Sequence, residues 1–182
     1  MPVSYIYLLP CAGPEDLAKI GMTVDPVGRW SAFSARWFEA FDLERALLVE
    51  AADRRDARRR EARLHRAFAP QRCPMPLHLR AQFGGASEWF RGAYDDARAQ
   101  LQRWCATGEV GPVDPGPLLA ARMAEQAQRL HELLEQAHAD ACAGMLAPTQ
   151  RRALRDLLAA HRHFDPGIEA TLPPHALLSL RD

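Results

Sequence analysis

The sequence predicts an α/β (α+β) protein: a small, mainly antiparallel three-stranded sheet flanked by helices, followed by a C-terminal helical hairpin. Three apolar, β-prone segments alternate with segments whose apolar residues recur at helical spacing. Residues 108–117 are rich in glycine and proline, which is typical of a linker. We therefore expect a first domain at residues 1–107 and a helical region at residues 118–182.

The three strands are predicted at residues 3–9, at residues 17–23 and within residues 41–51. In the first segment only Ser4 is polar, which indicates a central strand that is buried on both faces. Residues 10–14 contain two prolines and a glycine, so they form a turn. This turn joins the first two strands into a hairpin.

Two helices of the first domain have clear N-terminal signals. Asp25 precedes Pro26, and proline suits the first helical position, so a helix is predicted from there to about residue 38. Asp53 caps a second helix that is predicted to reach about residue 68.

Proline- and glycine-rich residues 69–86 predict a loop, and residues 88–90 predict a short extended piece. A third helix is predicted at residues 93–105, where the apolar residues have helical spacing.

The C-terminal region predicts two helices, at about residues 118–145 and 148–163, and an irregular end that contains Pro173 and Pro174. A continuous apolar stripe runs along the first of these helices. Such a stripe needs a partner surface, which could be the first domain, a second copy of the chain in a homodimer, or another protein.

Composition excludes several classes of protein. The hydrophobic share of 48% and the charged share of 25% are typical of a soluble globular protein. The chain has no apolar run that could span a bilayer and no signal-type N-terminus, so we expect a cytoplasmic protein without a membrane partner. The four cysteines lack short paired spacing and are expected as reduced thiols. Cys73 with His78 would form only half of a zinc site, and no second half is visible.

The net charge is zero, but it is unevenly distributed. Residues 53–72 carry eight arginines against three acidic residues. A local basic strip in a neutral protein is the pattern of a nucleic-acid footprint, and equally that of a well-solvated helix face.

Five short motifs carry a phenol, an amine, a guanidinium and carboxylates, which are groups suited to phosphodiester hydrolysis. In chain order they are Tyr5-Ile6-Tyr7, Lys19-Ile20-Gly21-Met22-Thr23, Arg29, Glu61 with His65, and Ser87-Glu88-Trp89-Phe90. Their order and spacing resemble the GIY-YIG nuclease superfamily. The closer likeness is to the branch with a Lys-Ile-Gly-x-Thr second motif and a closing Glu-Trp-Phe, and it covers residues 3–92.

The resemblance implies a role for Tyr7 and Lys19 in activating the attacking water. A nearby cation would lower the pKa of the Tyr7 phenol, and an ammonium would favour the phenolate or bind a phosphate oxygen. Each residue also has a structural interpretation, Tyr7 as a core aromatic and Lys19 as a surface lysine on an edge strand. Lys19 is the only lysine in the chain, beside 22 arginines, which favours a function.

The resemblance further implies that Arg29 clamps the scissile phosphate and that Glu61 binds Mg²⁺ or Mn²⁺. His65, one helical turn after Glu61, would orient it, touch the phosphate or protonate the leaving group. The structural interpretations are a solvated arginine, an acid that balances the arginine run, and an ordinary Glu–His helix pair. Around this site, exposed arginines would grip phosphates without reading bases, namely Arg55, Arg58, Arg59, Arg63 and Arg66.

One departure from the superfamily is that the chain has no asparagine, whereas much of the superfamily uses one to support the metal-binding carboxylate. The ordered motifs and the resemblance together predict a divalent-metal-dependent endonuclease, with DNA expected as the substrate in preference to RNA, and two alternatives remain. One is a nucleic-acid-binding module of the same fold with weak or no catalysis. The other is an interaction protein that acts through its C-terminal helices. The nuclease hypothesis requires Tyr7 and Glu61 to converge on one solvent-reachable hollow.

Overall fold

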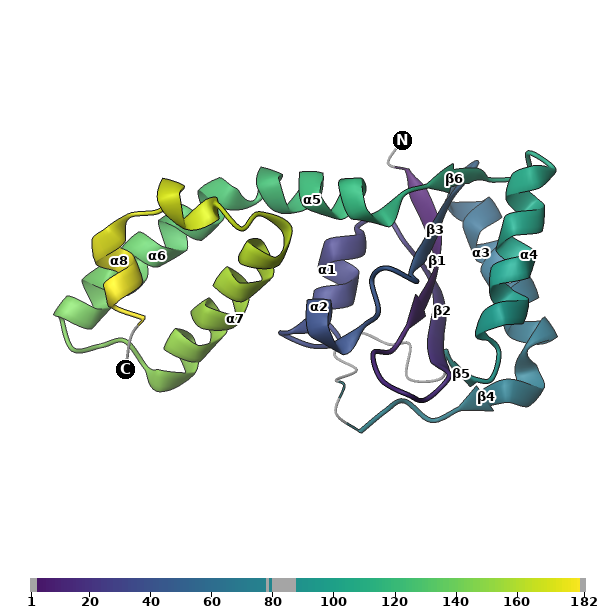
Figure 1. Cartoon of the computed structure of the whole chain (residues 1–182), viewed down its shortest axis with the longest axis horizontal. Helices are drawn as coiled ribbons and strands as arrows, with labels where there is room; N and C mark the ends of the chain where they lie inside the picture. Colours follow the sequence, from purple (N-terminus) through teal and green to yellow (C-terminus); the bar gives the residue numbers. More distant parts are fainter. Residues whose placement is uncertain (1–2, 78, 80–87, 181–182) are drawn as a thin grey trace. The chain divides into compact units, whose positions relative to one another are not determined.

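The computed structural model describes residues 3–77, 79 and 88–180 (Figure 1). The chain forms two compact units, Met1–Leu118 and Leu119–Asp182. The first contains a β-sheet with helices on both faces, and the second is helical.

The sheet of the first unit has six strands in the order β4-β5-β2-β1-β3-β6, and every neighbouring pair is antiparallel. The three predicted strands are present and form its centre. They are β1 (Ser4–Pro10), β2 (Leu17–Thr23) and β3 (Leu47–Ala51). The prediction of a three-stranded sheet was wrong in number, because three short strands extend the sheet at its edges. They are β4 (Arg72–Cys73), β5 (Trp89–Arg91) and β6 (Gly111–Val113).

The shortness of the added strands explains why the sequence did not predict them as strands. Each has only two or three residues, too few to show the alternation of a strand. β6 lies within residues 108–117, where glycine and proline predicted a linker, and it pairs with β3 instead. β4 lies in a segment that was predicted to be a loop.

One face of the sheet is covered by α3 (Arg54–Ala67) and α4 (Tyr94–Ala106), the helices to the right of the sheet in Figure 1. The side chains of Ile6, Leu8 and Ile20 point to this face and form a core with the two helices. As predicted, Asp53 caps α3, and its Oδ1 accepts the Asp56 backbone N–H at 2.7 Å.

The opposite face carries α1 (Pro26–Ser31) and α2 (Trp37–Ala40). The single helix predicted to residue 38 is therefore two short helices. Asp25 caps α1 as predicted, through a bond from the Gly28 N–H. Between the helices the Ser34 hydroxyl accepts the Arg36 N–H, a local bond that competes with helical hydrogen bonding and favours a turn.

The second unit contains helices α6 (Ala127–Cys142), α7 (Pro148–Phe164) and α8 (Pro174–Leu178) around a core of leucines. α5 (Pro115–Glu125) begins in the first unit and ends in the second. The helix predicted over residues 118–145 is thus divided near Gln126, and the end predicted to be irregular contains α8. Part of the predicted apolar stripe, including Leu130 and Leu134, is buried in this core.

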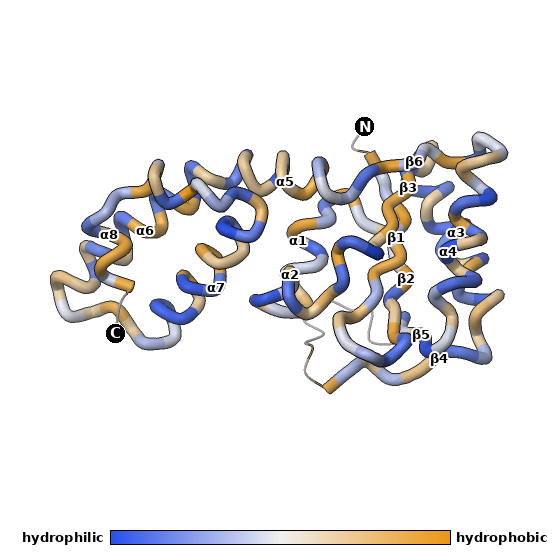
Figure 2. The backbone as a smooth tube through the Cα atoms, in the orientation of Figure 1, coloured by the Kyte–Doolittle hydropathy of each residue, from blue (hydrophilic) through white to orange (hydrophobic). Residues whose placement is uncertain are grey.

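Strand β1 is a continuous hydrophobic stretch at the centre of the sheet, in agreement with its burial on both faces (Figure 2). Within the described residues, none of the helices combines the length and the apolar character that crossing a membrane requires.

Candidate active site

The predicted site residues gather where strand β2 has an open edge. β5 pairs with β2 only from Leu17 to Lys19, so within the described residues the rest of β2 is paired with β1 on one side and has no strand on the other. The outward-facing backbone groups at this edge therefore need other partners, because an unpaired backbone group that is buried is costly.

Helix α3 supplies these partners from the face that it covers. His65 Nε2 lies 2.9 Å from the carbonyl oxygen of Ile20, so Nε2 carries the proton and donates it to that bond. One turn earlier, the Glu61 carboxylate accepts the Met22 backbone N–H. Because Ile20 and Met22 both point their backbone groups to the open edge, the edge fixes both side chains of α3 in place.

Tyr7 reaches the same edge from the opposite face. It is the cross-strand neighbour of Gly21, and a Cβ on Gly21 would overlap the Tyr7 hydroxyl and ring. The phenol therefore lies directly over the glycine backbone, and its ring edge packs against Trp30 with the centroids 5.9 Å apart. Glycine at position 21 is a steric requirement of this arrangement.

Lys19 is fully buried on the Tyr7 side of the sheet. Its Nζ bonds the Glu88 carboxylate at 2.8 Å and lies about 5 Å from the ring centres of Phe33 and Trp89. A carboxylate and two aromatic faces thus compensate the desolvated ammonium. The interpretation of Lys19 as a surface lysine was wrong, because no part of it is exposed.

Glu88 joins Lys19 to the last catalytic candidate. Arg29, in α1, places its guanidinium 3.9 Å from the same carboxylate and 5.1 Å from the centre of the Phe33 ring. No catalytic role was predicted for Glu88 from the sequence. A signal was present, because a chain with a single lysine on a buried strand needs an acid beside it.

Burial is the largest cause of the pKa shifts in the candidate site. It raises the pKa of Tyr7, and the neighbouring Arg29 only partly offsets this. The expectation of a lowered Tyr7 pKa was therefore wrong, and the phenol stays protonated at neutral pH. Burial also lowers the pKa of Lys19 against the opposing effect of Glu88.

The pKa values of Glu61 and His65, both in α3, are also shifted mainly by burial. Burial, then the charge of Glu88, raises the pKa of Glu61. Burial lowers the pKa of His65, so its imidazole is neutral at pH 7. With the proton on Nε2, the lone pair of His65 is on Nδ1.

The charges of Arg29, Glu88 and Glu61 all act on the Tyr7 phenol, so the residues lie in one electrostatic neighbourhood although their elements come from both faces of the sheet. Their access to solvent differs. Tyr7 and Lys19 have no exposed surface, whereas Arg29, Glu61, His65 and Glu88 are partly exposed. The predicted access to solvent is thus present for Arg29 and Glu61 and absent for the phenol and the amine.

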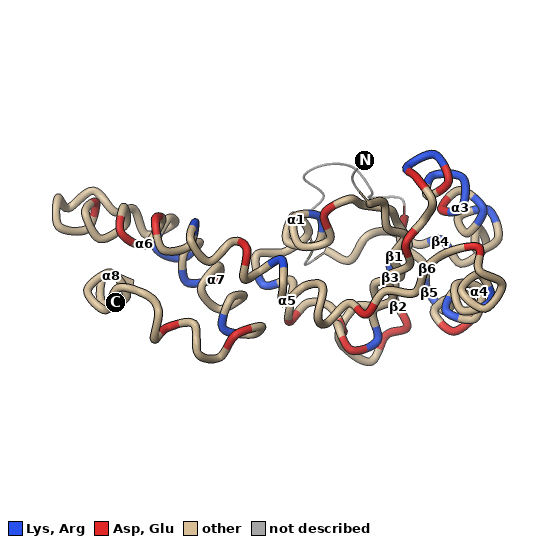
Figure 3. The backbone as a smooth tube through the Cα atoms, turned by 90° about the horizontal axis from the view of Figure 1, so that it is seen from above, with Lys and Arg blue, Asp and Glu red and all other residues tan. Residues whose placement is uncertain are grey.

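The predicted phosphate-gripping arginines are all exposed on α3, which is rich in basic residues (Figure 3). They do not form one group. Arg59 pairs with Asp56, and Arg63 lies 5.5 Å from the centre of the Trp104 ring on the flank towards α4. Arg58 is one turn from Glu61 and shares its flank. Within the described residues Arg55, Arg58 and Arg66 form no ion pair.

The described residues hold no ready-made group of three or more histidine, cysteine, aspartate or glutamate side chains placed for a metal ion. Glu61 forms no ion pair with any described residue and is partly exposed. One such carboxylate fits Mg²⁺, which keeps several waters and takes further ligands from substrate phosphate. Of the predicted half zinc site, His78 lies outside the described residues, as does Ser87 of the last motif.

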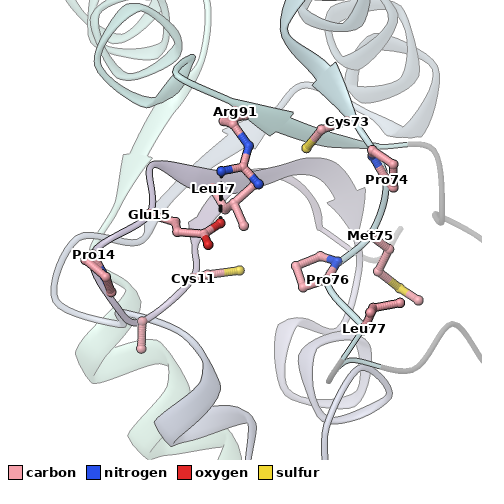
Figure 4. Close-up of a pocket in the computed structure, with 11 residues that line it drawn as sticks. Cys11, Pro14, Glu15, Leu17, Cys73, Pro74, Met75, Pro76, Leu77 and Arg91 are labelled. Atoms are coloured by element: carbon pink, nitrogen blue, oxygen red, sulfur yellow. Dashed lines mark ion pairs between the residues drawn. The ribbon is translucent and has the colours of Figure 1, made fainter.

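A separate hollow of about 600 Å³ in the first unit holds none of the predicted catalytic residues (Figure 4). Cys11, Cys73 and Met75 line it, beside an ion pair between Glu15 and Arg91 at 3.0 Å. Burial raises the pKa of Cys11 to about 11, so its thiol is protonated at neutral pH and is a poor nucleophile. All four cysteines of the chain are free, as expected.

Comparison with known proteins gives one result. Residues 4–105, more than half of the chain, match the model of the T5orf172 domain. The matched segment contains every predicted catalytic residue. No curated protein and no solved structure matches the chain significantly.

We predict that Gly21→Ala displaces the Tyr7 ring and destabilises the first unit by about 1–3 kcal/mol, the usual cost of overpacking. All four tryptophans lie in this unit, so fluorescence-detected urea unfolding measures the effect. Gly111→Ala is the matched control, because its Cβ would meet Glu50 at an ordinary 3.5 Å. Equal stability of the two variants would show that Tyr7 does not lie over Gly21.

We also predict that Glu61→Gln is more stable than the parent at neutral pH and that the difference vanishes below the ordinary glutamate pKa of 4.5. The folded state raises this pKa, so it binds the proton more tightly than the unfolded state and loses stability as the carboxyl ionises. Glutamine keeps an acceptor for the Met22 N–H, whereas Glu61→Ala loses it. Urea unfolding at pH 4 and pH 7 measures the difference, and a glutamine variant that is less stable at pH 7 contradicts the burial argument.

Proposed function

The chain belongs to the T5orf172 domain family, and on that premise we propose that its first unit is a divalent-metal-dependent endonuclease of GIY-YIG type. Its substrate would be a nucleic acid, with DNA preferred over RNA, and its reaction the hydrolysis of a phosphodiester bond. The nuclease association of the family supports this proposal. The cytoplasmic location expected from the sequence stays a proposal as well.

The observation that carries the proposal is the convergence at the open edge of β2. α3 contributes an acid and a neutral imidazole, α1 contributes a guanidinium, and β2 contributes an amine that is tied to Glu88. These groups come from four separate parts of the sequence. A purely structural ion-pair network would not need a carboxylate without an ion-pair partner at its rim, and among the described residues Glu61 has no such partner.

We assign metal binding to Glu61. Mg²⁺ or Mn²⁺ held there would neutralise charge on the phosphate and on the leaving oxygen. Arg29 is held in position by Glu88 and Phe33, and its planar fork would donate two hydrogen bonds to a non-bridging phosphate oxygen pair.

We assign proton transfer to His65 rather than to Tyr7. The His65 imidazole is neutral, and its Nδ1 lone pair can accept a proton from the attacking water. Tyr7 stays a neutral phenol because burial raises its pKa, so it would act by hydrogen bonding. Lys19 would act indirectly, by holding the Glu88 carboxylate that places Arg29.

The alternative of a binding module with little chemistry has one observation in its favour. Tyr7 and Lys19 are completely buried, and the charge of Lys19 is already compensated by Glu88 and two rings. In that case the residues at the open edge of β2 would stabilise the fold, and the arginines of α3 would bind the nucleic acid. Self-association or a protein partner through the C-terminal helices stays a proposal.

We predict that Glu61→Gln abolishes Mg²⁺-dependent cleavage of supercoiled and single-stranded DNA, with a loss of at least about a hundredfold, because a neutral amide binds a hard cation poorly. Gel assays with and without Mg²⁺ measure the rate. Glu50→Gln, on the exposed side of β3, is the control and should cleave normally. Cleavage by Glu61→Gln at the parent rate would rule out the assignment, and binding by the parent without any cleavage would favour the binding module.

We predict that the double change Arg55→Gln and Arg58→Gln weakens DNA binding about equally for all sequences and lowers the slope of log affinity against log salt by about 2. Fluorescence anisotropy over a salt series measures both quantities. The double change Arg98→Gln and Arg103→Gln on α4 removes the same charge elsewhere and should have a smaller effect. Equal effects of the two doubles would mean that α3 is not the contact surface.

A further inference from the structure

The second unit contains a cluster of metal-ligand side chains that the proposed nuclease does not use. His131, Glu135, His138 and Cys142 follow one another on α6 at intervals of four, three and four residues, which places them on one face of the helix. His175 of α8 lies against this face, with its ring centre 4.7 Å from that of His138.

Cys142 and His138 are already spaced as two ligands of one tetrahedral metal ion. The Cys142 sulfur is 3.7 Å from His138 Nε2. With a metal–sulfur distance of about 2.3 Å and a metal–nitrogen distance of about 2.0–2.1 Å, a tetrahedral angle separates the two donors by about 3.6 Å. A metal ion therefore fits between these atoms without a change in their separation.

The second ring nitrogen of His138 is held in the way that metal-binding histidines require. His138 Nδ1 is 2.8 Å from the hydroxyl of Ser179, the residue that follows α8, so this bond fixes the ring orientation. When Nδ1 donates to this hydroxyl, the lone pair of the ring lies on Nε2, which is then the nitrogen that can bind the metal.

His175 has the same kind of support. Its Nε2 lies 3.0 Å from a carboxylate oxygen of Glu135, which leaves Nδ1 outside this contact. A carboxylate that accepts the outer N–H of a histidine is the usual companion of a zinc ligand. His131 lies 3.9 Å from the other oxygen of Glu135 and adds a further imidazole at the rim.

We propose that Cys142, His138 and His175 bind one zinc-like transition-metal ion, with Ser179 orienting the His138 imidazole. Two donors are in place. The third, Nδ1 of His175, is delivered by rotation of an exposed side chain, and a water completes the tetrahedron. Thiolate and imidazole ligands select Zn²⁺ or Co²⁺ over Mg²⁺, so this ion is distinct from the one proposed at Glu61.

The site would join two elements that are far apart in the sequence. α6 supplies one helix face, α8 supplies His175, and Ser179 follows α8 directly. An ion that binds only the folded arrangement stabilises it, so the second unit should melt at a higher temperature with metal than without.

The test is a titration of the metal-free full-length chain with Co²⁺ followed by absorption. We expect one Co²⁺ per chain, tetrahedral visible bands and a near-ultraviolet thiolate-to-cobalt charge-transfer band. Cys142→Ser should lose the charge-transfer band, and His138→Ala should weaken binding by at least tenfold. Ser179→Ala should weaken it by about tenfold, as expected for an orienting partner.

Two controls separate this site from the rest of the chain. Cys105→Ser, a thiol change on α4, should leave the cobalt spectrum intact. Cys142 is exposed, so Cys142→Ser should fold as the parent does, by circular dichroism, and should keep any Mg²⁺-dependent cleavage. The proposal is overturned if Co²⁺ does not bind, or if the charge-transfer band persists in Cys142→Ser.

Discussion

The ion pair between Lys19 and Glu88 is the interaction on which the candidate active site depends. An ammonium without exposed surface cannot remain charged inside a protein unless a carboxylate compensates it, and removing one partner of such a buried pair typically costs roughly 3–5 kcal/mol. Glu88 immediately precedes β5, so the pair also joins the start of this short strand to β2. The start of β5 then defines where the edge of β2 opens, and Arg29 meets the same carboxylate there.

The open edge of β2 lets side chains from opposite faces of the sheet come close together. Tyr7 and Lys19 point to the face covered by α1, whereas Glu61 and His65 come from α3 on the other face. A continuous sheet would separate them. Because β5 is short, α3 can bond the free backbone groups of Ile20 and Met22, and the absence of a side chain at Gly21 lets Tyr7 approach from the opposite side.

Much of this arrangement could be predicted from the sequence, and the failures have physical causes. The central strands and α3 carry strong local signals: an unbroken apolar run in β1 and the Asp53 cap of α3. β4 and β6 are too short to have a pattern of their own, and pairing with longer strands creates them. The burial of Lys19 and the role of Glu88 depend on tertiary contacts between residues 69 positions apart, so they could be inferred only from the need to pair a buried charge.

The central proposal is that Glu61 binds a divalent metal ion at the open edge of β2, where His65 and Met22 are its neighbours. Paramagnetic broadening of backbone amide signals by Mn²⁺, measured by NMR in the presence of a short oligonucleotide, tests this most directly. The account predicts that the amides of Gly21, Met22 and His65 are broadened at low Mn²⁺ and that Glu61→Gln removes the effect. Sharp signals at all three positions, with broadening confined to other parts of the chain, would contradict it.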